Sequence, residues 1–503
     1  MHALHEHSFP FSIFRNDRNP FLDYVFKQEK MMKTDTIAAI ATALSESGIG
    51  IIRISGDEAI DVADRIFRSA GGRKILKEAE SHTIHYGFII DETKKESEDG
   101  NWKQLIVDEV MVSVMKAPRS YTTEDTVEIN CHGGVYMMRT ILELVLKNGA
   151  RMAEPGEFTK RAFLNGRIDL TKAEAVIDII KSQSKFAMEA SVTQLKGALA
   201  EVIRELRAGL IYEIAFIESA LDDPEHISLD GYPEELTSKV DQYILKIKKL
   251  IESADNGKLL KEGINTVIVG KPNAGKSSLL NLMVGEERAI VTDIAGTTRD
   301  VLQESVRMQG IGLNIIDTAG IRNTTDLVEQ IGVEKAKKFA ADADLIIYVV
   351  DASVPLDEND KEIISMIDEK NTIILLNKSD LDCIVEEEEL LSQIQNQNVR
   401  IVKTSTKENT GIDILENHIK ELFFHGMLRS NNEVVITSMR HKEALMDALY
   451  SLRQVKRSLE DEMPEDFYSI DLMSAYASLG LIIGEEIGED LVNEIFAKFC
   501  MGK

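Results

Sequence analysis

The residues with the clearest chemistry form the run Gly-Lys-Pro-Asn-Ala-Gly-Lys-Ser at positions 270–277. An apolar stretch, Thr266–Val269, precedes this run, and a helical pattern, Ser278–Met283, follows it. That order is typical of a phosphate-binding loop, in which glycines let backbone amides turn inward around phosphate oxygens at a helix N-terminus. In such a loop the lysine reaches the β- and γ-phosphates and the next hydroxyl binds Mg²⁺, so we assign these roles to Lys276 and Ser277.

Two downstream motifs offer further groups to the phosphates and the metal ion. Asp317-Thr-Ala-Gly320 ends a second apolar stretch, so its carboxylate can lie in the outer coordination sphere of Mg²⁺ while the Gly320 amide approaches the γ-phosphate. Within Gly296–Asp300, Thr298 provides a second hydroxyl for Mg²⁺. The loop and these motifs predict nucleoside triphosphate binding but do not specify the base.

Two more motifs specify the base. Asn377-Lys-Ser-Asp380 follows an apolar strand, and its last carboxylate can accept two hydrogen bonds from N1 and N2 of guanine, which adenine cannot supply. Ser405-Thr-Lys407 can contact the far edge of the base. The ordered set, on five predicted strand ends, therefore predicts GTP binding. The predicted contacts are Asn273, Ala274, Gly275, Lys276, Ser277, Ser278, Thr292, Asp293, Ile294, Ala295, Gly296, Thr297, Thr298, Asp317, Thr318, Ala319, Gly320, Asn377, Lys378, Ser379, Asp380, Ser405, Thr406 and Lys407.

The groups that would promote hydrolysis are less obvious from the motifs. Ras-like enzymes orient the attacking water with a glutamine just after the Asp-x-x-Gly glycine, whereas Ile321 stands at that place here. Glu329 can orient water, and a solvated carboxylate at a helix start is the alternative. Asn273 can give an oxygen to a monovalent cation, or it can simply form a turn. Arg299 can act as an arginine finger, but local pairing is favoured for it.

Composition limits what the rest of the chain can be. Its 503 residues suggest about three domains. With 44% hydrophobic and 28% charged residues, the chain is not disordered, collagenous or of low complexity. A formal charge of −27 has the wrong sign for holding nucleic acid mainly by neutralising phosphates, so RNA contact needs local basic patches or a partner. Three scattered cysteines and the lack of a membrane-length apolar run favour the cytoplasm.

Hydrophobic periodicity predicts the elements that position these motifs. The first region is mixed α/β, with strands expected at 50–55, 83–90, 110–115 and 126–130, helices at 58–68 and 135–147, and a C-cap at Gly149. A helical region follows, in which Lys185–Leu221 is one long amphipathic stretch. Strands and helices then alternate, which predicts a parallel sheet with helices on both faces; the strands are expected at 266–269, 313–316, 345–350, 372–376 and 400–404.

These patterns divide the chain into four segments. Residues 1–31 are interpreted either as a disordered extension or as the result of a start codon assigned too far upstream. Residues 32–165 form the mixed α/β N-terminal domain. Residues 166–260 and 426–503 are expected to pack together as a discontinuous helical domain, with a Ras-like GTPase domain, 261–425, inserted between them.

Several stretches resemble the tRNA modification GTPases of the MnmE (TrmE) family. In the GTPase domain they are the loop with its following Ser-Leu-Leu-Asn and the segment Val291–Asp300. Elsewhere they are Thr34–Thr42, Glu124–Gly134, Pro155–Asn165 and the ending Phe499–Lys503. The resemblance extends from Thr34 to the C-terminus.

The resemblance implies a function as well as a domain plan. The N-terminal domain would dimerise and bind 5-formyl-tetrahydrofolate or a related one-carbon folate. GTP hydrolysis, with K⁺ and Mg²⁺, would drive C5 modification of the tRNA wobble uridine to a 5-carboxymethylaminomethyl or aminomethyl type. The reaction would take place in a complex with an FAD-dependent partner of the MnmG type, which would contribute much of the tRNA surface.

Particular residues match the functional positions of that family. Glu329 corresponds to the water-orienting glutamate, and Lys276 is the second catalytic assignment. The implied potassium ligands are Asn273, Thr292, Ile294 and Thr297. The implied folate contacts are Arg53, Glu128, Arg167 and Lys503. Cys500 is either a catalytic thiol or a small buried hydrophobe.

Two other functions compete with this interpretation. A ribosome-assembly GTPase would use the flanking domains to bind RNA, but the chain lacks a basic KH-like segment after the GTPase domain and has the Cys-x-Gly-Lys ending instead. A GTP-gated scaffold would use the nucleotide only as a switch, and its hydrolysis would be incidental.

Overall fold

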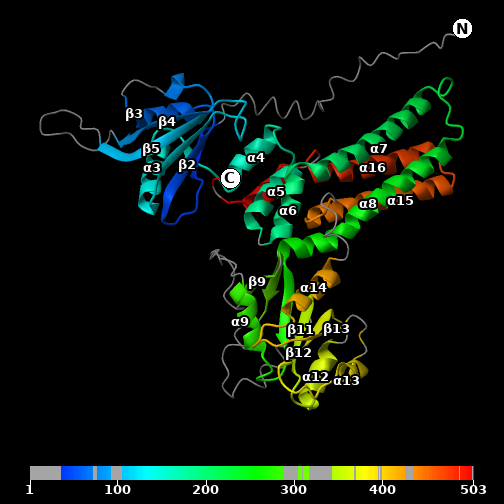
Figure 1. Ribbon diagram of the computed structural model, residues 1–503. Coiled ribbons are helices and arrows are strands. Elements are labelled where there is room, and N and C mark those ends of the chain that lie inside the picture. Colours follow the sequence, from blue (N-terminus) through cyan, green and yellow to red (C-terminus); the bar gives the residue numbers. More distant parts are fainter. Residues whose placement is uncertain are drawn as a thin grey trace, which may run out of the picture. The chain divides into compact units, whose positions relative to one another are not determined.

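A computed structural model describes the chain at residues 35–71, 76–91, 105–182, 184–286, 304–308, 310–316, 343–367, 370–394, 396, 399–424, 434–485, 488–500 and 502. The chain divides into two compact units, Met1–Ile168 with Gly488–Lys503 and Asp169–Ile487. The predicted extension, 1–31, lies outside the described residues. Figure 1 shows both units.

The first unit is built on a seven-stranded sheet of order β3-β4-β5-β6-β2-β1-β7. β1 pairs with β7 in parallel, and the other neighbouring strands are antiparallel. The strands are β1 (Ile37–Ile40), β2 (Ser47–Ser55), β3 (Phe67–Ser69), β4 (Thr83–Asp91), β5 (Leu105–Met115), β6 (Thr126–Gly133) and β7 (Arg151–Met152). The helices are α2 (Ala59–Ile66), the 3₁₀ turn η1 (Leu76–Glu78), α3 (Val135–Lys147), α4 (Glu157–Leu164) and α17 (Glu489–Ala497).

Alternation along the strands gives this sheet one covered and one open face. On β5, Val110, Val112 and Val114 are buried in a core that also holds side chains of α2 and α3. The intervening Met111 is 56% exposed on the opposite face. Sequence periodicity predicted α3 at its observed bounds, but the helix expected at 58–68 ends at Ile66, because the chain turns into the edge strand β3.

The C-terminal segment belongs to this first unit. Phe496 of α17 lies with its ring centroid 6.2 Å from that of Phe163 on α4, and Lys160 donates a hydrogen bond to Asn493 over 2.7 Å. The sequence-based boundary, which assigned all of 426–503 to the helical domain, differs from this arrangement. Helical periodicity indicates which face a helix buries but not which domain it is buried against.

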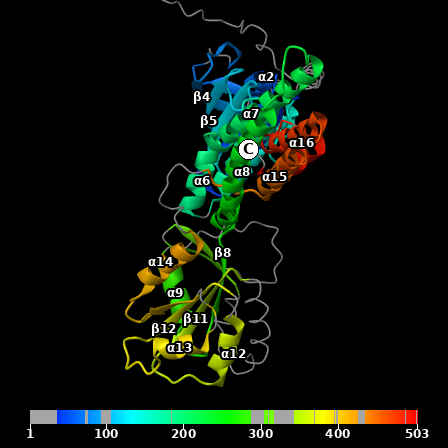
Figure 2. The ribbon, with the colours of Figure 1, turned by 90° about the vertical axis from the view of Figure 1, so that its right-hand side faces the viewer.

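The helical part of the second unit is a bundle made from two distant stretches of chain. Figure 2 shows α7, α8, α15 and α16 running side by side, and they share one apolar core. None of the helices in the described part of the chain combines the length and apolar character that crossing a bilayer requires. The helices are α5 (Leu170–Lys181), α6 (Lys185–Leu195), α7 (Ala198–Asp222), α8 (Tyr232–Glu262), α15 (Met439–Glu460) and α16 (Glu465–Ile483).

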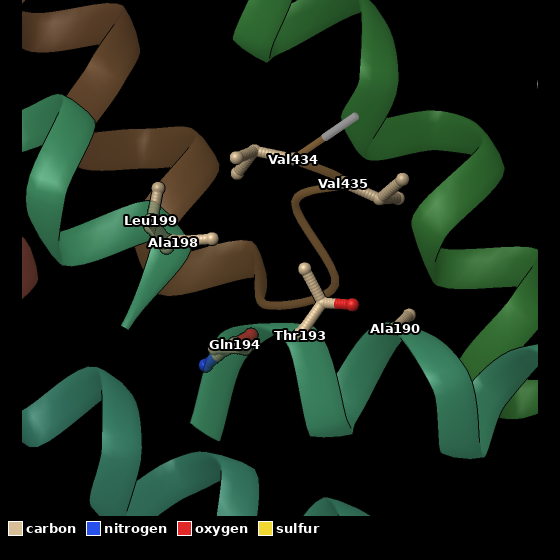
Figure 3. A pocket seen from close by; sticks show the side chains of 7 residues that line it. All are labelled: Ala190, Thr193, Gln194, Ala198, Leu199, Val434 and Val435. Atoms are coloured by element: carbon tan, nitrogen blue, oxygen red, sulfur yellow. The ribbon is translucent and has the colours of Figure 1, made fainter. Parts of the chain in front are cut away.

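The stretch 185–221, predicted to be continuous, is broken into two helices. Gly197 adopts a φ of +96°, a left-handed conformation that ends α6 and starts α7 in a new direction. Hydrophobic periodicity continues through the break, so the sequence pattern predicted one continuous helix. Val434 and Val435, from the segment after the GTPase domain, line a small cavity together with residues of both helices (Figure 3). The cavity between them measures about 10 Å³, room for about one water molecule rather than a substrate.

The inserted domain is a six-stranded sheet of order β13-β12-β11-β8-β10-β9. Its strands are β8 (Ile264–Val269), β9 (Glu304–Met308), β10 (Ile311–Ile315), β11 (Leu345–Asp351), β12 (Thr372–Asn377) and β13 (Val399–Lys403). Its helices are α9 (Lys276–Glu286), α12 (Glu358–Ile367), α13 (Glu387–Gln393) and α14 (Ile412–Phe423). α9 and α14 share the core of one face and α12 and α13 that of the other (Figure 2). The five predicted strands form the parallel part, while β9, which was not predicted, pairs antiparallel with β10 at the edge.

Candidate functional site

The phosphate-binding loop leaves β8 at Gly270, where the backbone has no room for a side chain. Its φ is +147°, and a Cβ there would lie 2.3 Å from the carbonyl oxygen of Val349 on β11. The loop then curls around the lysine side chain, because Lys276 Nζ donates hydrogen bonds to the carbonyls of Gly270 and Lys271 over 2.6 and 2.7 Å. Burial lowers the pKa of Lys276. The lysine predicted to reach the phosphates is therefore held inside the loop that would cradle them.

One side chain joins this loop to the base-binding motifs. Asn377, at the end of β12, donates from Nδ2 to the carbonyl of Ala274 over 2.8 Å and accepts at Oδ1 from the Thr406 amide over 3.1 Å. Gly275 is packed against it so closely that a Cβ would lie 2.1 Å from Asn377 Nδ2. The loop, the Asn377–Asp380 motif and the Ser405–Lys407 motif thus form one site at the carboxyl edge of the sheet, as predicted.

The carboxylate that would read guanine is fixed by its neighbours. Ser405 Oγ donates to Asp380 Oδ1 over 2.7 Å, and Lys407 Nζ lies 3.8 Å from Oδ2. The Ser405 hydrogen bond is the main cause that lowers the pKa of Asp380, and the charge of Lys407 adds to it. Asp380 therefore stays an ionised acceptor, which suits the two N–H groups of the guanine edge.

Lys378, in the same motif, is paired with a carboxylate at the end of the neighbouring strand. Its φ is +63°, and its Nζ lies 2.5 Å from Asp351 Oδ2 at the end of β11. The Ser379 amide donates to the Thr404 carbonyl over 3.0 Å, so the two base-binding motifs are hydrogen-bonded to each other. This backbone pairing and the hydrogen bond from Ser405 to Asp380 connect the two motifs at two points.

The predicted ion sites are described in part. Ser277 is exposed in the first turn of α9, and Asn273 is exposed in the loop with a φ of +61°. Both positions suit an oxygen ligand, for Mg²⁺ and for a monovalent cation respectively. The other predicted residues of these ions and of hydrolysis lie outside the described residues: Thr292, Asp293, Ile294, Ala295, Gly296, Thr297, Thr298, Asp317, Thr318, Ala319, Gly320 and Glu329.

The predicted folate contacts gather on the open face of the first unit's sheet. Arg53 of β2 and Glu128 of β6 are cross-strand partners, and the guanidinium donates to Glu128 Oε1 over 2.8 Å. Arg53 also donates to the backbone carbonyl of Gly502 over 3.1 Å. A Cβ on Gly502 would lie 2.5 Å from the Ile40 carbonyl, so the C-terminal tail is packed tightly at this place.

An aromatic side chain connects the remaining contact to this pair. The Tyr121 ring lies 5.7 Å from the Arg53 guanidinium and 5.0 Å from that of Arg167, which also donates to the Tyr121 carbonyl over 2.8 Å. Sequence reasoning missed Tyr121, since nothing in the spacing of the three residues signals that they meet. Cys500 is exposed although the preceding Phe499 is buried, so the interpretation of Cys500 as a buried hydrophobe was wrong. Lys503 lies outside the described residues.

Comparisons with known proteins match both the N-terminal domain and the rest of the chain to one family. The family model described as "MnmE helical domain" matches residues 170–500, and "GTP-binding protein TrmE N-terminus" matches residues 36–167. A tRNA modification GTPase MnmE from Lachnoclostridium phytofermentans is 57% identical over 94% of this chain and 100% of its own length. The chain belongs to the MnmE family of tRNA modification GTPases. As a member of the MnmE family, it is a GTP hydrolase.

A second relative matches over the same share of the chain. The MnmE of Clostridioides difficile is 49% identical over 94% of this chain and its own full length. Among solved structures, an Aquifex aeolicus Era variant bound to GDP and AlF₄⁻ is 26% identical and covers 37% of this chain and 66% of its own, with a TM-score of 0.24.

Proposed function

We propose that this MnmE-family chain is a potassium-stimulated GTPase that drives C5 modification of the tRNA wobble uridine together with an FAD-dependent partner. The product is of the 5-carboxymethylaminomethyl or aminomethyl type. The observation that carries the proposal is the guanine-reading carboxylate, Asp380, fixed by Ser405 beside a phosphate-binding loop in a chain of this family. Because the chain carries a charge of −27, we expect the partner to provide much of the surface that binds tRNA. The three free cysteines favour the cytoplasm as the location of the chain.

Wobble nucleosides of cellular tRNA test the coupling between hydrolysis and modification. We expect cells that lack this protein to lose the C5-modified wobble uridines, and the wild-type gene to restore them. Glu329→Ala should bind GTP but fail to restore the modification, because the attacking water loses its orienting group. Mass spectrometry of digested tRNA measures the outcome. Unchanged nucleosides in the deleted strain would refute the function, and restoration by Glu329→Ala would support the scaffold instead.

Mg²⁺ and K⁺ are the ions we propose for the nucleotide site. Ser277 would hold Mg²⁺ with Thr298, and Asn273 would give a side-chain oxygen to K⁺ with Thr292, Ile294 and Thr297. The ions supply positive charge against the phosphates, which the site needs because the arginine-finger role has no strong candidate in the sequence. The exposed Asn273 amide, on a loop residue with positive φ, supports its part of the assignment.

A one-carbon folate is the ligand we propose for the cluster around Tyr121. Glu128 can accept hydrogen bonds from the amide edge of a pterin, and Arg53 and Arg167 suit the carboxylates of its glutamyl tail. The Tyr121 ring, which lies near both guanidinium groups, adds an aromatic contact surface for the pterin. Lys503 and Cys500 would stand at the edge of this site, because Gly502 contacts Arg53.

Removing the guanidinium of Arg53 should weaken folate binding about 10- to 100-fold, the effect of losing one hydrogen bond between charged groups. Calorimetric titration of the full-length chain with 5-formyl-tetrahydrofolate measures the change. Arg139→Ala, an exposed arginine of α3, is the control and should bind like the wild type. Wild-type affinity in Arg53→Ala, or no binding by the wild type, would remove folate from this cluster.

The same face of the sheet is the surface we propose for a homodimer. Its exposed apolar side chains include Ile49 of β2, Ile84 and Tyr86 of β4 and Met111 of β5, each at least half exposed. An exposed apolar sheet face of this kind typically marks a protein interface. We expect Met111→Glu to give monomers in sedimentation experiments, because the face would have to bury a carboxylate. Met188→Glu, on α6, should remain dimeric; a dimeric Met111→Glu would contradict this interface.

A further inference from the structure

The second residue of the phosphate-binding loop sends its charged side chain away from the loop. Lys271 Nζ lies 2.6 Å from Asp360 Oδ2 and 3.1 Å from Asp357 Oδ2, both at the start of α12. The Lys271 side chain is only 16% exposed. Burial acts to lower its pKa, but the hydrogen bonds to Asp360 and Asp357 outweigh burial and raise it. Lys271 is therefore a charged anchor between the loop and a helix that carries none of the nucleotide motifs.

Asp360 is held more firmly than an ordinary surface carboxylate. Its side chain is 1% exposed, and its Oδ1 accepts a 2.7 Å hydrogen bond from the hydroxyl of Tyr348, a fully buried residue of β11. Its Oδ2 accepts a 2.9 Å hydrogen bond from the Asp357 amide. Both oxygens are thus satisfied by buried or backbone groups, which gives the carboxylate one orientation. Asp357, by contrast, is 52% exposed.

The anchor is connected to the catalytic lysine through the backbone. The carbonyl of Lys271, the residue whose side chain Asp360 holds, accepts one of the two hydrogen bonds from Lys276 Nζ. The neighbouring carbonyl, of Gly270, accepts the other, and Gly270 itself packs on Val349 of β11. Both residues that contact Lys276 are therefore connected to β11. Gly270 contacts Val349 of that strand directly, whereas Lys271 is connected through Asp360 to Tyr348.

We propose that Asp360 is a positioning residue of the GTPase site, which acts through Lys271 to fix the backbone of the phosphate-binding loop. The buried carboxylate also keeps the Lys271 ammonium paired at α12, so that Lys276 is the loop's cation for the phosphates. A displacement of about 1 Å in such a loop is enough to cost affinity and rate, since the amides that meet the phosphates must keep their directions. The proposal adds a residue to the GTPase site that none of its sequence motifs contains.

A double-mutant cycle tests whether Asp360 acts through Lys271. The full-length chain is titrated with a fluorescent GDP analogue, and kcat and KM for GTP are measured at saturating KCl. We expect Asp360→Asn and Lys271→Ala each to weaken nucleotide binding about tenfold, the effect of one charge-assisted hydrogen bond. The double variant should be no weaker than either single variant, because both substitutions remove the same connection. Lys271→Arg should retain most of the affinity, since it keeps the charge.

Matched controls separate positioning from general stability. Asp357→Asn removes the exposed partner of the same lysine and should change nucleotide affinity less than about twofold, as exposed pairs contribute little. Tyr348→Phe removes the hydrogen bond that orients Asp360 and should weaken binding in the wild type but not in Lys271→Ala. The proposal is overturned if Lys271→Ala binds like the wild type, or if the losses of the two single variants add in the double variant. An additive result would mean that Asp360 stabilises the domain without acting on the loop.

Discussion

Replacing Asp380 with asparagine should lower the affinity for GTP by roughly 10³-fold or more and shift the preference to xanthosine triphosphate. In the proposed site the carboxylate would accept hydrogen bonds from N1 and N2 of guanine, whereas the asparagine amide would face the N2 amino group with its own NH₂ donors. Two donors that face each other in a closed site both lack an acceptor. The cost of these unpaired groups lets the site discriminate strongly against guanine. Xanthine has a carbonyl at C2, so it restores the match.

Competition titrations with GTP, GDP and xanthosine triphosphate on the full-length variant measure this switch. Ser405→Ala keeps the carboxylate but removes the hydroxyl that donates to it over 2.7 Å. That control should weaken GTP binding modestly, by about tenfold at most, and should not recruit xanthosine triphosphate. An Asp380→Asn variant that still prefers GTP would mean that another group reads the base, and the order of motifs would lose its meaning as a guanine signature.

GTP turnover in KCl should exceed turnover in NaCl by about tenfold or more, and Asn273→Ala should erase most of this difference. An arginine finger can accelerate hydrolysis by about 10³- to 10⁵-fold, and the proposed potassium ion beside the phosphates would supply part of the same charge stabilisation. Asn273 is exposed in the loop with a φ of +61°, where a small side-chain oxygen is available to an ion.

Steady-state phosphate release in chloride salts of K⁺, Na⁺ and Rb⁺ at equal ionic strength measures the effect. Asn273→Asp should keep an oxygen at this position and so retain a dependence on the cation. Lys407→Ala is a second control, since this lysine contacts Asp380 at the base and should leave the ratio between K⁺ and Na⁺ unchanged. Equal rates in KCl and NaCl for the wild type would remove the potassium site from the proposal.

The GTPase domain could be derived from sequence because its chemistry is local. The glycine loop, the Asn377–Asp380 motif and the Ser405–Lys407 motif each follow a run of buried strand residues, and the carboxyl ends of parallel strands meet at one edge of a sheet. Strand order therefore did not need to be known in advance. Edge strand β9 escaped prediction, because a short segment paired on one side carries a weak periodic signal.

Features that depend on long-range packing could not be derived in this way. The break at Gly197 interrupts a hydrophobic pattern that continues on both sides. A single glycine within a helical pattern is not enough to predict a turn. The pairing of α17 with α4 joins residues more than 300 positions apart, as the Lys160–Asn493 hydrogen bond illustrates. Tyr121 was missed for the same reason. The ion pair between Lys271 and Asp360 connects the loop to the start of α12, a helix that contains none of the nucleotide motifs.

The hydrogen bond between Arg53 and Gly502 spans 449 positions of the chain. Because the ribosome makes polypeptides from the N-terminus, Arg53 is synthesised long before Gly502. The hydrogen bond between them can form only after Gly502 has been added. Translation must complete the helical bundle and the GTPase domain first. The contact between Arg53 and Gly502 therefore forms only after both of these parts have been synthesised, and contacts of such high sequence separation are among the last and slowest to form.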